Sequence, residues 1–216
     1  MKIKNLIIAM LTLISAAAEA QSFNDFFTDK TLRVNFILGG NANSQNIYIS
    51  DMNSIDGWYG RKNHLAEFPV EGNTQFELKD KKTGKVIYRN SLSTLFQEWQ
   101  TYPEAKTSNR SFENVILMPM PKDTATLTIS LISNRRQIAG SITETISPTD
   151  ILIRKTGEEP APYEVLNKAA DQEKCIHIAF LAEGYTDKEM DKFINDARIA
   201  TDAIFAHEPF KKYQDR

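Results

Sequence analysis

The chain has 216 residues, with 26 basic and 28 acidic side chains and a formal net charge of −2 at pH 7. These charges are scattered along the sequence, which excludes a positive field of the kind that binds nucleic acid or an anionic membrane. A single cysteine, Cys175, excludes an intramolecular disulfide framework. Its place in an apolar run predicts a buried, unreactive thiol.

Residues 1–20 have the pattern of a secretory signal peptide. Lys2 and Lys4 form a positive start, residues 6–18 are largely apolar, and Ala18-Glu19-Ala20 supplies a small-x-small cleavage site. The apolar part is shorter than the roughly 20 residues that a membrane span needs. Cleavage would leave 24 basic and 27 acidic residues, a net charge of −3. We therefore expect an exported protein, whether periplasmic, cell-surface or secreted, with no membrane span after cleavage.

From Thr31 to about Arg154, the sequence has the short alternating runs that are typical of β-strands. The expected strands span residues 32–38, 46–50, 68–70, 75–78, 86–89, 112–118, 125–132, 137–144 and 150–154. Gly84 can take the positive φ that a hairpin requires, and Pro119 and Pro121 are expected to end their strand. Residues 92–100 could form a helical turn between sheets. This series predicts a β-sandwich over residues 21–156.

Residues 157–174 have the composition of a linker, because Pro160 and Pro162 follow Gly157 and cannot continue a sheet ladder. Beyond it, residues 175–182 are nearly all apolar and predict a strand covered on both faces. Thr186 and Glu189 have the spacing of a capping box at the start of a helix. The apolar stripe of that helix comprises Met190, Phe193, Ile194, Ala197, Ala200 and Ile204. A strand and a helix alone cannot bury enough surface to be a domain, so residues 175–216 are expected to be the truncated start of a larger α/β domain.

No group of residues in the sequence has the pattern of a catalytic or metal-binding site. The segment His207-Glu-Pro-Phe-Lys211 matches an H-E-x-x-H zinc helix only in part, because Lys211 stands where the second histidine belongs. Pro209 would also disrupt the helix on which that spacing depends. His64 lies in a polar loop, and packing explains His177 on one face of its expected strand. We therefore assign no catalytic residue, metal ligand or cofactor to these 216 residues.

The segment Gly57-Trp-Tyr-Gly60 places two aromatic side chains in a loop of the predicted sandwich. Exposed aromatic rings build platforms for sugars or peptides, so Trp58 and Tyr59 are possible ligand-contact residues. The alternative is that an aromatic residue here closes the end of the sandwich.

The end of the chain resembles a known family. The runs Phe180-Leu-Ala-Glu-Gly-Tyr-Thr186, Glu189-Met-Asp-Lys-Phe193 and Phe205-Ala-His-Glu-Pro-Phe210 resemble the start of the catalytic domain of the M64 (IgA peptidase) family. Its members are secreted bacterial zinc metallopeptidases in which a β-sandwich precedes the catalytic domain. The resemblance implies a mainly β chain, with a sandwich followed by the first strand and helix of an incomplete α/β zincin-like domain.

The resemblance also implies zinc, held in the family by an H-E-x-x-H segment that these 216 residues lack. The substrate would be a protein or peptide, reached through the missing catalytic domain. The chain is therefore expected to be the accessory N-terminal region of such a peptidase and to be inactive alone. The alternative is a non-enzymatic exported module whose sandwich binds a glycan or a protein.

Overall fold

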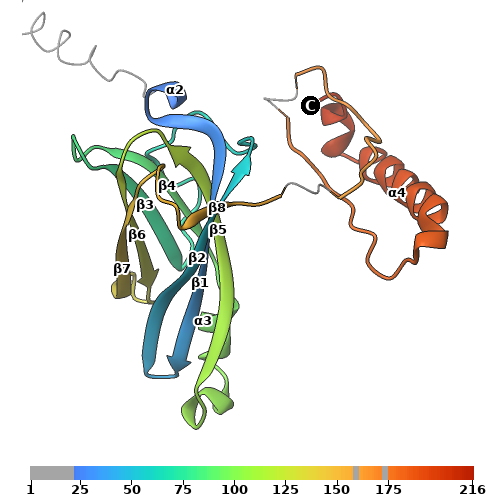
Figure 1. The fold of residues 1–216 in the computed structure, drawn as a ribbon. Helices are drawn as coiled ribbons and strands as arrows, with labels where there is room; N and C mark the ends of the chain where they lie inside the picture. Colours follow the sequence, from blue (N-terminus) through green and yellow to red (C-terminus); the bar gives the residue numbers. More distant parts are fainter. Residues whose placement is uncertain (1–21, 158–160, 172–174) are drawn as a thin grey trace, which may run out of the picture. The chain divides into compact units, whose positions relative to one another are not determined.

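The computed structural model describes residues 22–157, 161–171 and 175–216 (Figure 1). The predicted signal peptide at residues 1–20 lies outside the described residues. The chain divides into two compact units, with the division between Glu158 and Glu159. The first unit contains all the strands of the described residues, and the second contains the longest helix.

The first unit consists of two four-stranded sheets with one apolar core between them. One sheet has the order β5-β1-β2-β8 and the other the order β4-β3-β6-β7. Neighbouring strands are antiparallel, except that β8 runs parallel to β2. The elements of this unit are α2 (Phe23–Phe26), β1 (Phe27–Asn41), β2 (Ser44–Asp56), β3 (Thr74–Asp80), β4 (Val86–Leu92), α3 (Leu95–Trp99), η1 (Pro103–Lys106), β5 (Arg110–Pro121), β6 (Ala125–Ile132), β7 (Ile138–Ile146) and β8 (Ile153–Lys155).

Alternation along the strands builds the core of the sandwich. In β1, Leu32, Val34, Phe36 and Leu38 are buried, and in β6 the same holds for alternate residues from Ala125 to Leu131. Successive side chains of a strand point to opposite faces, so each sheet contributes one apolar face to a shared interior. The prediction of a mainly β fold is confirmed.

The hairpin between β3 and β4 is also confirmed. Gly84 lies in the turn with φ of +71°, a conformation that glycine adopts without strain. The carboxylate of Asp80 accepts hydrogen bonds from the backbone N–H and the hydroxyl of Thr83, at 2.7 and 2.6 Å. The side chain of Asp80 therefore fixes the turn that sets the register of the hairpin.

Two expectations about proline-containing segments were wrong. Pro119 does not end its strand but lies inside β5, opposite Thr31 of β1, and the strand ends only at Pro121, which lies opposite Phe27. β5 is at the edge of its sheet, where a residue without an N–H can face the unpaired side at no loss to the ladder. The short strand expected at 68–70 is instead part of a loop, with Val70 74% exposed.

The second unit holds η3 (Asp187–Glu189), α4 (Met190–Phe205) and η4 (Phe210–Tyr213). The capping box is confirmed, since both the backbone N–H and the hydroxyl of Thr186 donate to the Glu189 carboxylate, at 3.0 and 2.7 Å. The predicted stripe of α4 is only partly covered, and Ala197 is its one buried member. None of the helices in the described ranges is long and apolar enough to cross a membrane.

The strand expected at residues 175–182 is not formed. These residues have no regular secondary structure, and Ile176 and Leu181 are 84% and 81% exposed. A strand exists only when a neighbouring strand completes its hydrogen bonds, and within the described ranges no other segment pairs with this one. The apolar sequence is therefore present without the sheet that would bury it.

Candidate functional site

The two aromatic residues predicted as ligand contacts lie in the loop of residues 57–73, called here the β2–β3 loop. Trp58 is 8% exposed, and its ring meets the ring of Tyr88 edge-on with the centroids 6.0 Å apart. The indole Nε1 of Trp58 donates to the backbone carbonyl of Arg61 at 3.1 Å. Tyr59, by contrast, is 84% exposed. Trp58 therefore belongs to the core, and Tyr59 alone of the pair presents its ring to solvent.

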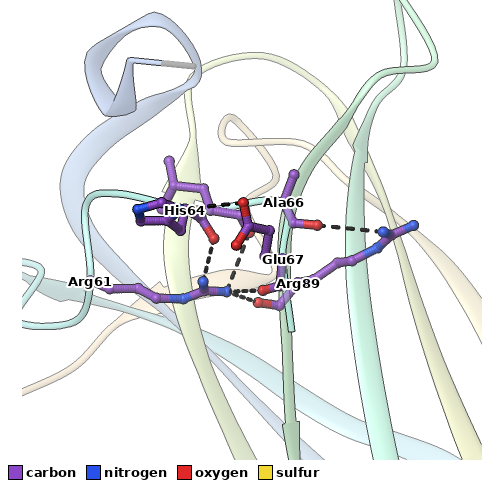
Figure 2. A network of polar contacts seen from close by, with 6 residues as sticks. Arg61, His64, Ala66, Glu67 and Arg89 are labelled. Atoms are coloured by element: carbon purple, nitrogen blue, oxygen red, sulfur yellow. Dashed lines mark hydrogen bonds and ion pairs between the residues drawn. The ribbon is translucent and has the colours of Figure 1, made fainter. Parts of the chain in front are cut away.

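Arg61 fastens the β2–β3 loop to strand β4 (Figure 2). Its guanidinium donates to the backbone carbonyls of Glu67 at 2.6 Å and of Leu65 at 3.3 Å, and also to those of His64 and Arg89. The same group lies over the ring of Tyr88, 5.3 Å from its centroid. The planar guanidinium presents several donors in fixed directions, so one side chain can satisfy carbonyls from different segments.

Tyr88 is the centre on which this end of the sandwich packs. Its ring has the rings of Phe27, Trp58 and Phe76 within 6.3 Å, centroid to centroid. Only 1% of Tyr88 is exposed, and this burial raises the pKa of its hydroxyl, which accepts a hydrogen bond from the side chain of Asn90 at 3.2 Å. The arrangement stabilises the fold, and the buried hydroxyl has no access to a substrate.

A polar hollow of about 440 Å³ lies at another place on the first unit. It is formed where the β1–β2 turn, helix α3 and the β6–β7 turn meet, and we call it the amide hollow. Its polar side chains are mainly amides, together with one cation: Gln45, Gln97, Gln100, Asn134, Arg135 and Gln137. No sequence motif indicated this site, because its residues come from three distant segments that only the topology brings together.

The amides of the hollow divide into two groups. Gln97 and Gln100 have structural roles, since Gln97 Nε2 donates to the carbonyl of Ile132 at 3.2 Å and Gln100 Nε2 to that of Asn41 at 2.6 Å. The side chains of Asn134, Arg135 and Gln137 are exposed and make no hydrogen bond or ion pair with the described residues. The second group is therefore available to a ligand.

A second hollow, of about 410 Å³, lies over strands β1, β2 and β5. Here the carboxylate of Asp51 accepts hydrogen bonds from the side-chain amides of Asn35, at 2.8 Å, and of Asn53. The bond from Asn35 is the main reason that the pKa of Asp51 is lowered. The hydrogen bonds of this carboxylate are thus already made by amide donors of the same sheet. We therefore regard this hollow as a polar surface of the sheet.

In the second unit, the polar contacts serve to hold α4. The Asp196 carboxylate accepts hydrogen bonds from Lys192 Nζ at 2.7 Å and from the Tyr185 hydroxyl at 2.9 Å. These bonds lower the pKa of Asp196, Lys192 first, and raise that of Tyr185. The ring of Tyr185 also packs on Phe193, with the centroids 5.2 Å apart. Together these contacts tie the segment before the helix to its first turns.

The histidines and the cysteine of this unit do not form a metal centre with the residues described. His207 lies beyond the end of α4, and Cys175, half-buried, has its Sγ 3.8 Å from His177 Nε2. Nowhere in the described ranges do three or more His, Cys, Asp or Glu side chains gather to hold a metal ion.

Two models of known protein families match the chain. A family model described as peptidase M64 N-terminus matches residues 22–143, more than half of the chain, and one described as IgA peptidase M64 matches residues 165–216. The chain belongs to the M64 peptidase family. The M64 N-terminus match begins at α2 and ends within β7, and the M64 peptidase match lies in the second unit. A search of the curated proteins found no match for the chain.

M64 peptidases use zinc, and the residues present here do not fit that metal. A catalytic zinc takes three protein ligands and a water molecule. The only partial match to a zinc motif of this M64 chain has Lys211 in place of a histidine, and its His207 lies outside any helix. No step of zinc chemistry can therefore be assigned to these side chains.

Proposed function

We propose that the chain is the accessory N-terminal region, with the opening of the catalytic domain, of an exported M64 zinc metallopeptidase. The observation that carries the proposal is the pair of M64 matches, which follow one another along a single chain. The proposed domains are a sandwich at residues 21–156, a linker at 157–174 and the start of the peptidase domain at 175–216. The substrate class is a protein or peptide, as for peptidases in general.

The zinc ligands and the general base would come from residues that are not among these 216. In support, the sequence contains no H-E-x-x-H segment, and its apolar residues 176–181 are largely exposed, as expected for a strand whose sheet is absent. When zinc is bound by such a peptidase, it activates a water molecule for attack on the peptide carbonyl. The sandwich would hold substrate or orient the catalytic domain.

Export of the protein follows from the signal-peptide pattern of residues 1–20. The positive start, the apolar centre and the Ala18-Glu-Ala20 cleavage site together direct a chain through a secretory route. The use of a single cysteine in an exported protein means that the sandwich depends on its apolar core, with no disulfide to support it.

A second candidate is a non-enzymatic exported module that binds a glycan or a protein. The 84% exposed ring of Tyr59 favours it, because exposed aromatic rings stack on sugars. In that case Tyr59→Ala should abolish retention of the chain on a glycan array while leaving its unfolding transition unchanged. An unchanged array profile would contradict this candidate.

The experiment that tests the peptidase proposal compares two proteins. One is the 216-residue chain, and the other is the same chain extended by the codons that follow Arg216 in its gene. We expect only the extended protein to bind one zinc ion and to hydrolyse denatured casein, with a chelator stopping the reaction. Hydrolysis by the 216-residue chain, or a stop codon directly after Arg216, would contradict the proposal.

A further inference from the structure

The four outer edges of the two sheets differ in how far they are protected. Each sheet ends in two edge strands, whose unpaired backbone groups can add a further strand. In the first sheet, β5 carries Pro119 and Pro121, which remove backbone donors, and β8 has only three residues. β8 is therefore too short to offer a long ladder of free hydrogen-bonding groups, whereas on β5 such a ladder is limited to Arg110–Met118, before the first proline.

The edge of β4 is covered by the β2–β3 loop. The backbone N–H of Arg89 donates to the carbonyl of Leu65 at 2.8 Å, and Ser91 Oγ accepts from the N–H of Gly72 at 2.9 Å. Arg61 holds the same loop in place through the Arg89 carbonyl (Figure 2). This edge of the sandwich is therefore closed by the chain itself.

Among the described residues, the edge of β7 has no strand paired to it, although the backbone of β2 lies near its start, where the Gln45 carbonyl oxygen is 3.6 Å from the position that a Cβ on Gly140 would take. This strand has nine residues, Ile138–Ile146, with no proline and no lysine, and pairs with β6 on one side. Within the ranges that the structure describes, no backbone hydrogen bond is made on its other side. Such an edge presents alternating donors and acceptors that match the main chain of an extended polypeptide.

The amide hollow adjoins the start of this open edge. Gln137 directly precedes β7, and Arg135 lies in the turn that leads to it. Free amide side chains can donate to and accept from peptide groups, while Arg135 supplies a positive charge suited to a carboxylate. Glu144, near the far end of β7, is exposed and negative. The edge therefore has a positive charge at its beginning and a negative charge towards its end.

We propose that β7 and the amide hollow bind an extended polypeptide segment of about seven residues, as an added antiparallel strand. An antiparallel segment brings its C-terminal end to Arg135 and its N-terminal end to Glu144. A terminal or side-chain carboxylate would then meet the Arg135 guanidinium, and an amino group would meet Glu144. A glycan fits this site less well, because no aromatic side chain lines the hollow. The proposal rests on the proposed function, for which it names the mode of substrate capture.

Binding is tested by calorimetric titration of the full chain with synthetic seven-residue peptides of alternating Val and Ser. The first peptide has free termini, and the second carries N-methyl groups on alternate residues, which remove the donors of one edge. The third peptide carries the N-methyl groups on the remaining residues instead. The donors on each of the two edges of the peptide are thus removed in turn. We expect the unmethylated peptide to bind and one methylated form to lose binding completely. Equal binding of all three peptides would overturn the proposal.

Two further peptides show whether the carboxylate that meets Arg135 is the C-terminal one or that of a side chain. One ends in a C-terminal amide, and the other ends in glutamate followed by that amide. If a side-chain carboxylate serves, the glutamate peptide regains the affinity that amidation removes. If only the C-terminal carboxylate serves, amidation weakens binding in both peptides. If neither amidated peptide binds more weakly than the peptide with free termini, the role given to Arg135 is overturned.

Charge reversal tests the orientation of the segment. Arg135→Glu should weaken binding of the free-termini peptide about tenfold, and an amidated peptide ending in lysine should bind this variant better than it binds the original chain. Arg154→Glu is the matched control, since it changes the net charge equally. Arg154 is opposite Asn53 of β2, eight residues and about 26 Å along the strand from Gln45 of the hollow. Equal losses in the two variants would overturn the proposal.

A second copy of the chain is the competing occupant of the open edge. If β7 paired with β7 of another copy, the chain would sediment as a dimer and excess peptide would not dissociate it, which would also overturn the proposal. We expect a monomer at the concentrations used for titration. Because no readout depends on hydrolysis, failure of peptide binding and failure of the peptidase assay are independent results.

Discussion

Arg61 shows how one side chain can hold a long loop without an acidic partner. Its guanidinium donates to four backbone carbonyls of the β2–β3 loop and β4 and lies over the ring of Tyr88. Lysine keeps the charge but cannot present donors in these fixed directions. Carbonyls that lose their donor in a partly buried place each raise the energy of the folded state.

We therefore predict that Arg61→Lys lowers the free energy of unfolding by about 2 kcal/mol. The control is Arg136→Lys, because Arg136 pairs with Glu71 on the surface at 3.1 Å. That change should cost less than about 1 kcal/mol. Urea unfolding followed by circular dichroism measures both, and equal losses would show that the hydrogen bonds of Arg61 do not fix the loop.

Asp80 gives the sandwich a dependence on acid. The hydroxyl and the backbone N–H of Thr83 donate to its carboxylate, and the hydroxyl bond is the main cause of its lowered pKa. A folded-state pKa below the unfolded value means that the contribution to stability is complete above about pH 4. It is lost as the pH falls through the folded-state pKa, because the unfolded chain takes up the proton first.

The expected result is that Asp80→Asn is less stable than the original chain at neutral pH and that the difference shrinks below about pH 4. Urea unfolding at a series of pH values measures it. Glu113→Gln, an exposed change on edge strand β5, serves as the control and should leave the pH profile unchanged. A constant difference between Asp80→Asn and the original chain at all pH values would contradict this assignment.

At the scale of elements, helix α3 is attached to the sandwich by one face only. Phe96 is fully buried and its ring lies 5.6 Å from that of Phe112 and 5.9 Å from that of Trp99, between centroids. Leu95, the adjacent residue on the same helix, is 69% exposed. The helix has five residues and cannot be stable by itself, so its packing decides its position.

We predict that Phe96→Ala lowers the free energy of unfolding by about 3–5 kcal/mol, because it leaves a cavity among aromatic rings. Leu95→Ala, on the exposed face, should change it by less than about 0.5 kcal/mol. Thermal unfolding of the two variants compares them directly. Similar values for both would mean that α3 does not pack as described.

The strands also show which parts of the fold could be predicted from the sequence. Strands with one buried face, such as β1 and β6, were recognised because Leu32 to Leu38 and Ala125 to Leu131 alternate. The continuation of β5 through Pro119 could not be recognised, because proline is tolerated only at a sheet edge and the sequence does not state which strand lies there. The opposite error occurred at residues 175–182, where the apolar pattern predicts a strand that is not formed. Such a strand needs a neighbouring strand to pair with, and the local pattern cannot show whether one is present.

The candidate site was less predictable than the fold. The aromatic pair was visible in the sequence, yet nothing in Gly57-Trp-Tyr-Gly60 distinguishes the buried Trp58 from the exposed Tyr59. The two differ because the Trp58 ring meets Tyr88, which is thirty residues away along the chain. The amide hollow depends wholly on such long-range contacts, so local patterns could not indicate it.

At the scale of the whole molecule, the two units differ in how much apolar surface they bury. Every residue of the main core cluster lies between Phe23 and Ile146. The second unit exposes Ile176, Leu181 and Ile199, and its one buried apolar residue within the described ranges is Ala197. Apolar burial is the main source of stability, so the first unit is expected to fold without the second.

We predict that residues 22–157 alone unfold in one cooperative transition with the same midpoint in urea as the first unit has in the full chain. Residues 161–216 alone should exchange their backbone amides rapidly, because little apolar surface is protected. Hydrogen exchange measures both proteins. Strong amide protection in the isolated second unit would contradict the proposed opening of a larger domain.

The placement of the tryptophans has a practical consequence for optical work on this protein. The chain has two tryptophans, Trp58 and Trp99, and both indoles are buried in the first unit. The chain's one thiol, Cys175, is in the second unit. Intrinsic emission excited at the indole band therefore reports on the sandwich alone, and a thiol-linked dye reports on the peptidase-like segment. A single sample thus carries two spectroscopic reporters, one for each unit, without any engineered residue.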